Sequence, residues 1–135
     1  MQNNRETEQR IRNVPGRKIR RILEALDAVD GSRLPTAWSH FMAVGAGTHV
    51  WPDANHRTTM SVFSLFSERA FGQLVGLPSA LAAEMVVASK AMRDGDRRNR
   101  PGKARYYTVE ELADPTHPYR LLFAAYESAL IFKPA

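Results

Sequence analysis

One short segment, residues 49–60 with the sequence HVWPDANHRTTM, gathers side chains that could do acid–base and phosphate chemistry. A histidine such as His49 changes protonation near physiological pH, so it suits a general base that takes a proton from a hydroxyl. Asp53 offers hard oxygens of the kind that Mg²⁺ binds beside phosphate, and Arg57 offers a planar fork that pairs with phosphate oxygens. Asn55 could hold the loop or donate a hydrogen bond to a negatively charged oxygen. Together these residue types predict transfer of a phosphorus group to a hydroxyl.

The backbone of this segment also favours an anion site. Pro52 fixes its own φ and biases Trp51 toward extended geometry, so the loop is stiff and Trp51 would anchor it from below. If the next helix begins near Asn55, its unpaired N–H groups and positive dipole end point back into the loop. A zinc site is a poor alternative, because His49 and His56 are seven residues apart and the chain contains no cysteine.

The ordered combination resembles the signature loop of the Fic/Doc family, H-x-F-x-D/E-G/A-N-G/K-R. The matching positions are His49, Trp51 in the place of phenylalanine, Asp53, Ala54, Asn55 and Arg57. Within the family, DANHRT is closest to the death-on-curing (Doc) toxins, whose motif reads D-A-N-K-R-T. The resemblance covers residues 15 to about 93, strongly in the loop and faintly outside it.

This resemblance implies an enzyme that transfers part of a nucleotide to a protein hydroxyl. Doc-type members act as kinases that move the terminal phosphate of ATP, and AMP transfer by the same site is the alternative. His49 would be the catalytic base, Asp53 the Mg²⁺ ligand and Arg57 the catalytic phosphate clamp. The nucleotide phosphates would be bound by Ala54, Asn55, His56 and Arg57. The implied partners are ATP as the substrate, a target protein with an acceptor Ser, Thr or Tyr hydroxyl, and a small antitoxin.

Two departures from the family pattern, besides Trp51 in the place of phenylalanine, and a search for an inhibitory motif shape these expectations. His56 takes the place of Gly or Lys, so its bulk should obstruct the pose used for AMP transfer, and its positive charge should depend on pH. Met60 stands where AMP-transferring members carry a second arginine, which is again the Doc-like state. Ser64 and Glu68 have the spacing of the family's inhibitory motif, but Arg69 follows them. We therefore expect control by a separate antitoxin instead of self-inhibition.

The elements that must position this loop are predicted to be helices. We find no alternating apolar pattern long enough to build a sheet, so we expect an all-α, compact single-domain bundle of the Fic/Doc type, with the motif loop between two core helices. Residues 1–14 should form a flexible polar arm and residues 15–135 the domain. A first helix after Pro15 would bury a stripe made of Ile19, Ile22, Leu23, Leu26 and Val29.

Turn and capping residues predict the other boundaries. The second helix should start at Thr36 as N-cap and unwind at Gly45 and Gly47, and the motif helix, apolar almost all round, should be central, buried and ended by Gly72. Three further helices are expected. The first runs from Pro78 or Ser79 to Gly95, with Met85 and Met92 as core filler. A short helix runs from the Thr108–Glu111 capping box to Pro115, and a last amphipathic helix covers 117–132.

Composition narrows the function classes. The absence of cysteine excludes disulfides and thiolate metal sites. A polar N-terminus and the lack of any apolar run near 18 residues predict a cytoplasmic protein without membrane association. The net charge of +5 makes an acidic partner plausible. Nucleic acid is not the expected partner, but a catalytically degenerate basic binding module remains the alternative class of function.

Overall fold

The computed structural model of the chain describes residues 33–49, 55–99 and 107–135. The expected arm 1–14 and the helix after Pro15 lie outside these residues. The described part is mostly helical, as predicted, and the elements are α3 (Leu34–Gly47), α4 (Asn55–Phe71), β1 (Gln73–Gly76), α5 (Ser79–Asn99), α6 (Val109–Leu112), α7 (Pro118–Ala124), the 3-10 turn η2 (Glu127–Ala129) and β2 (Ile131–Pro134).

Helix α3 begins at Leu34, and the predicted N-cap at Thr36 is wrong. Pro35 lies in the first turn, where its missing N–H removes no helical hydrogen bond, so the helix starts ahead of Thr36. The predicted unwinding at Gly45 and Gly47 is also wrong, because the helix continues to Gly47. Both glycines serve close packing: a Cβ on Gly45 would lie 2.2 Å from Oγ1 of Thr59 in α4.

Helix α4 begins at Asn55, directly after the motif loop, and ends at Phe71. Gly72 follows with a φ of +66°, a conformation that favours glycine, so the predicted stop is confirmed. The expectation that α4 is buried almost all round is only partly met, because its buried side chains lie on one face. They are Asn55, His56, Thr58, Thr59, Phe63 and Ser67.

The prediction that the chain forms no sheet is wrong. Strands β1 and β2 pair antiparallel, with Gln73 opposite Pro134 and Gly76 opposite Ile131. Each strand has four residues, which is too short for an alternating pattern to stand out in the sequence. The last predicted helix, 117–132, begins as expected but is too long: α7 stops at Ala124, and the apolar residues beyond it enter η2 and β2.

Helix α5 starts at Ser79 as predicted but runs past Gly95 to Asn99. A Cβ on Gly95 would have open space around it, so this glycine is a partly exposed position inside the helix and not its end. Met85 is buried and Met92 packs against the core, which confirms both as core filler. The Thr108–Glu111 capping box is also confirmed, and α6 ends before Pro115.

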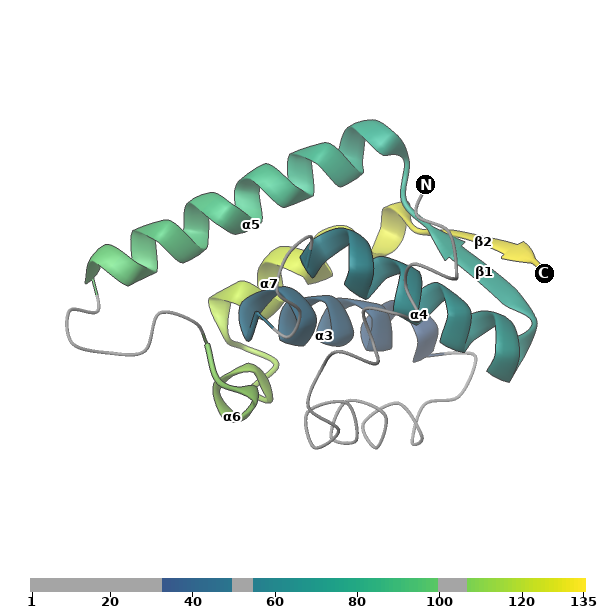
Figure 1. The fold of residues 1–135 in the computed structure, drawn as a ribbon, viewed down its shortest axis with the longest axis horizontal. Coiled ribbons are helices and arrows are strands. Elements are labelled where there is room, and N and C mark those ends of the chain that lie inside the picture. Colours follow the sequence, from purple (N-terminus) through teal and green to yellow (C-terminus); the bar gives the residue numbers. More distant parts are fainter. Residues whose placement is uncertain (1–32, 50–54, 100–106) are drawn as a thin grey trace.

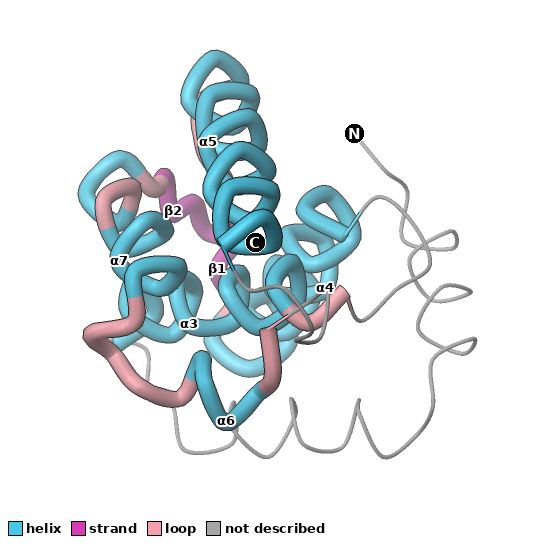
Figure 2. The backbone as a smooth tube through the Cα atoms, turned by 90° about the vertical axis from the view of Figure 1, so that its left-hand side faces the viewer, coloured by secondary structure: helices cyan, strands magenta, loops and turns pink. Residues whose placement is uncertain are grey.

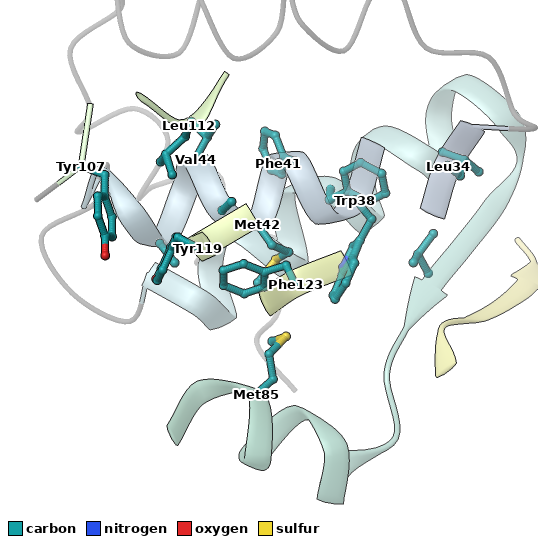
Figure 3. Packing of buried hydrophobic residues seen from close by; sticks show 14 residues of the cluster. Leu34, Trp38, Phe41, Met42, Val44, Met85, Tyr107, Leu112, Tyr119 and Phe123 are labelled. Atoms are coloured by element: carbon teal, nitrogen blue, oxygen red, sulfur yellow. The ribbon is translucent and has the colours of Figure 1, made fainter. Parts of the chain in front are cut away.

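Helices α3, α4 and α7 pack together, and the long helix α5 lies across them (Figures 1 and 2). The core is aromatic where α3 meets α7: the ring centroids of Trp38 and Phe123 are 6.5 Å apart, and those of Tyr119 and Phe123 are 5.2 Å apart. Met85 reaches from α5 toward this cluster (Figure 3). Among the described residues, no helix has the length and apolar character needed to cross a bilayer.

Candidate functional site

The end of α3 and the start of α4 bring two of the predicted site residues together. His49 comes two residues after α3 ends, and Asn55 is the first residue of α4. Asn55 Nδ2 lies 3.0 Å from His49 Nδ1, and the Asn55 side chain is only 6% exposed. Helix α4 therefore begins beside the predicted base. The other motif residues, Trp51, Pro52, Asp53 and Ala54, lie outside the described residues.

His49 has an unusual backbone. Its φ is +54°, in the left-handed region that costs a residue with a Cβ about 1–2 kcal/mol. Among the described residues, His49 is the one non-glycine residue with a positive φ. Such strained positions persist only where the surroundings fix them, and they occur often at functional sites.

The surroundings that fix His49 are contacts at the C-terminal end of α3. Carbonyl oxygens at a helix end lack helical partners, and here three different segments supply them. The carbonyl of Val44 accepts from Thr48, that of Ala46 from Arg93 Nη1 in α5 at 3.4 Å, and that of Gly47 from the backbone N–H of Tyr107 at 2.9 Å. The end of α3, just ahead of His49, is thus held in part by Arg93 and Tyr107, which lie more than 40 positions further along the chain.

Arg57 lies in the first turn of α4 with an exposed side chain. It borders a groove of about 310 Å³ between α4 and α5, whose lining includes Met60 and Ser61 from α4 and Ala82, Met85 and Val86 from α5. Apart from Arg57 and His56, the groove is lined mostly by apolar side chains. An anionic ligand with an apolar or aromatic part would suit this combination of one exposed guanidinium and an apolar floor.

His56 has a different environment from the one expected. Its ring is only 8% exposed, and its Nε2 lies 2.7 Å from Ser89 Oγ, which in turn lies 2.6 Å from the Tyr119 hydroxyl. Burial, and to a lesser extent the positive charges of Arg93 and Lys90, lower the pKa of His56 to about 4. The ring is therefore neutral at physiological pH. The prediction that His56 binds phosphate, supplies a pH-dependent charge or obstructs AMP transfer is not supported by this placement.

Met60 also has a structural partner. The indole N–H of Trp38 donates to Met60 Sδ at 3.2 Å, and Met60 packs against the core. An arginine at this position would remove that acceptor from a fully buried tryptophan. The packing thus gives Met60 a structural role beside Trp38.

Sequence reasoning missed the residues that surround the motif from other helices, chiefly Ser89, Arg93 and Tyr119. For two of these residues, the helical spacing in the sequence did indicate a buried position. Ser89 lies four residues after Met85, so a hydroxyl occupies a core-facing position of α5. Tyr119 lies four residues before Phe123 and shares its buried face. Arg93 had no such sign, because basic residues are frequent at exposed positions of helices.

The arrangement offers a histidine with an amide partner, a helix N-terminus, an exposed arginine and a groove. No cluster of three or more histidine, cysteine, aspartate or glutamate side chains able to hold a metal occurs within residues 33–49, 55–99 and 107–135. Asp53, the predicted Mg²⁺ ligand, is not among those residues. Comparison of the chain with protein-family models, with curated proteins and with solved structures gave no match.

Proposed function

We propose that the protein is a Doc-like phosphotransferase of the Fic/Doc type, which transfers the terminal phosphoryl group of ATP to a hydroxyl of a target protein. The observation that carries this proposal is the 3.0 Å contact between His49 and Asn55 at the start of α4. It joins two motif residues at a helix N-terminus, which is the environment that phosphate transfer requires. Arg57, exposed in the same first turn of α4, adds a guanidinium able to bind phosphate oxygens.

The proposed step is a displacement at the γ-phosphorus. The acceptor hydroxyl forms the new O–P bond and loses its proton to the imidazole of His49, while the bond from the γ-phosphorus to the β–γ bridging oxygen breaks and ADP leaves. Arg57 stabilises the charge that gathers on the phosphoryl oxygens. The N–H groups at the start of α4 hold the phosphate in place.

Magnesium and further partners enter the proposal through the motif. Asp53 would hold Mg²⁺, which supplies neutralising charge to the phosphates when it is bound. The target protein would present a Ser, Thr or Tyr hydroxyl, and a small antitoxin would control the activity. AMP transfer is the alternative chemistry of the same site. The packing of Met60 against Trp38 favours terminal phosphoryl transfer, because it occupies the position of the second arginine that AMP-transferring members use.

The proposal is tested with ATP labelled on either the α- or the γ-phosphorus, incubated with cell extract and Mg²⁺. We expect label on protein from the γ-labelled sample only, and loss of at least about 10²-fold in rate for His49→Ala, as is usual when a general base is removed. Label from the α-labelled sample would instead establish AMP transfer. No label on protein from either sample, with His49→Ala identical to wild type, would leave a binding module as the better account.

A matched pair of arginine variants tests the clamp. Arg57 and Arg69 are both exposed on α4, the first in its opening turn and the second in its last. Replacing either by alanine changes the net charge equally, so long-range attraction of ATP falls equally. We expect Arg57→Ala to lower the transfer rate strongly and Arg69→Ala to leave it near wild type. Equal losses would show that only the overall charge matters.

A further inference from the structure

Met60 lies at the boundary between the core and the groove between α4 and α5. It is partly exposed and contributes to the groove lining, yet its Sδ accepts the indole N–H of the fully buried Trp38 at 3.2 Å. We propose that Met60 is an oxidation site, at which a hydroperoxide that enters the groove converts the thioether into a sulfoxide. This proposal does not depend on the phosphotransferase function.

The step transfers one oxygen atom from the peroxide to the sulfur. A lone pair on Met60 Sδ attacks one peroxide oxygen, so the S–O bond forms while the O–O bond breaks. The proton of the transferred oxygen passes to the leaving oxygen, which departs as water or as an alcohol. The sulfur loses two electrons and the peroxide gains them, so the protein needs no other redox group.

The contact with Trp38 decides which side of the sulfur is attacked. A thioether sulfur has two lone pairs, and the indole N–H of Trp38 occupies one of them. Because the indole has no exposed surface, a reagent from the groove reaches the other lone pair. A sulfoxide sulfur is chiral, so attack from one side gives one of its two epimers. We therefore expect a single epimer at Met60.

Oxidation changes both sides of this boundary. The added oxygen is a hydrogen-bond acceptor in a groove lined mostly by apolar side chains. Arg57 lines the same groove and lies three positions before Met60 on α4, so its guanidinium is a suitable donor to this oxygen. In the core, the sulfur becomes a poorer acceptor once it is bonded to oxygen, so the N–H of Trp38 loses hydrogen-bond strength in a place that solvent does not reach.

Limited treatment of the folded protein with hydrogen peroxide, followed by peptide mapping in a mass spectrometer, tests the site. We expect Met60 to be oxidised before Met42 and Met85, which are at most 1% exposed. Met85 is the sharper control, because it lines the same groove. Met92 is partly exposed like Met60 but is not among the residues that line the groove. Complete oxidation of Met92 with Met60 intact would overturn the proposal.

The effect on Trp38 is measured by ¹⁵N NMR of its indole N–H. The chain has two tryptophans, and the Trp51→Phe variant identifies the Trp38 signal. We expect peroxide to shift this signal in wild type and in Met92→Leu, and to leave it in place in Met60→Leu, where leucine keeps the apolar volume but has no sulfur. The same shift in Met60→Leu would show that oxidation elsewhere is responsible.

The side of attack is tested after digestion of the oxidised protein. Two classes of methionine sulfoxide reductase exist, each specific for one epimer. We expect only one of them to reduce the Met60 peptide from protein oxidised in its folded state. The same peptide from protein oxidised in urea is the control, and each reductase should reduce part of it. Equal action of both enzymes on the peptide from folded protein would contradict shielding of the sulfur by Trp38.

Discussion

His49 has a left-handed backbone conformation in a chain position where the sequence offers no glycine. A residue with a Cβ is strained there, and glycine is not, although glycine also has the larger loss of chain entropy on folding. The strained residue is therefore the same one that we predict to be the base. Glycine at position 49 would avoid this strain, so backbone stability does not account for a histidine there.

This strain can be measured with two variants that both lack the imidazole. We expect His49→Gly to be more stable than His49→Ala by about 1 kcal/mol in urea unfolding, since only alanine retains the penalty of a positive φ. Gly72 provides the converse control, because its φ is +66° and its added Cβ would meet nothing within 4 Å. Gly72→Ala should cost about 1 kcal/mol. Equal stability of the two His49 variants would show that no strain is stored.

His56 predicts a pH dependence of stability. Its folded-state pKa of about 4 lies below the ordinary value of 6.5, because burial penalises the charged ring. As the pH falls from about 6.5 toward 4, the unfolded chain binds a proton that the folded protein does not, so the free energy of unfolding decreases. The stabilisation is complete above about pH 6.5, and its loss at pH 4 amounts to about 3 kcal/mol.

The measurement compares urea unfolding of wild type and His56→Gln at pH 7 and pH 4.5. Glutamine can still meet Ser89 and does not titrate, so the variant should lose less stability between the two pH values than wild type does. His40, whose pKa is also lowered by burial, stays in both proteins and contributes equally to both. The same pH dependence in both proteins would contradict the neutral, buried state of His56.

At the scale of elements, α3 and α4 approach closely because Gly45 faces Thr59. We interpreted this glycine as the end of a helix, since glycine is frequent there. The sequence does not show that Thr59, 14 residues further along, packs against it. The same reasoning placed a stop at Gly95, where the helix also continues. The two glycines look alike in sequence and differ only in what lies opposite them.

A matched pair of glycine substitutions separates these roles. In Gly45→Ala the new Cβ would lie 2.2 Å from Thr59 Oγ1, so the helices must move apart, and we expect a loss of about 1–3 kcal/mol. In Gly95→Ala the Cβ enters open space within α5, and the better helix propensity of alanine should add about 0.5–1 kcal/mol. Thermal unfolding measures both. A loss at both positions would mean that α5 is packed on both faces.

Local sequence features correctly predicted those helix boundaries that depend only on neighbouring residues. The Thr108–Glu111 capping box, the start of α5 at Ser79 and the end of α4 before Gly72 are all local features, and all three predictions are confirmed. Strands β1 and β2 depend on pairing between segments nearly 60 residues apart, so no local pattern revealed them. The tertiary contact outweighed the helical spacing of residues 117–132.

At the scale of the whole molecule, the candidate site also combines features that the local sequence predicts with features that depend on long-range packing. Its motif residues follow one another in the sequence, and the helix after them was predicted from its apolar residues, with a start near Asn55 taken as an assumption. The groove, the cap at Ala46 and the buried Ser89–Tyr119 pair depend on how α5 and α7 lie against α4. Those positions follow from long-range packing, which the periodicity of one chain does not specify.

The capping of α3 by three segments has a consequence for the order of folding. A chain emerging from the ribosome has all twelve residues 49–60 available long before Arg93 and Tyr107 are made, and contacts of such long sequence separation form slowly. The helix end that holds His49 is therefore completed late. A chain halted before Tyr107 would contain every motif residue and still lack the N–H that fixes Gly47, so the site would mature only with the last helices of the domain.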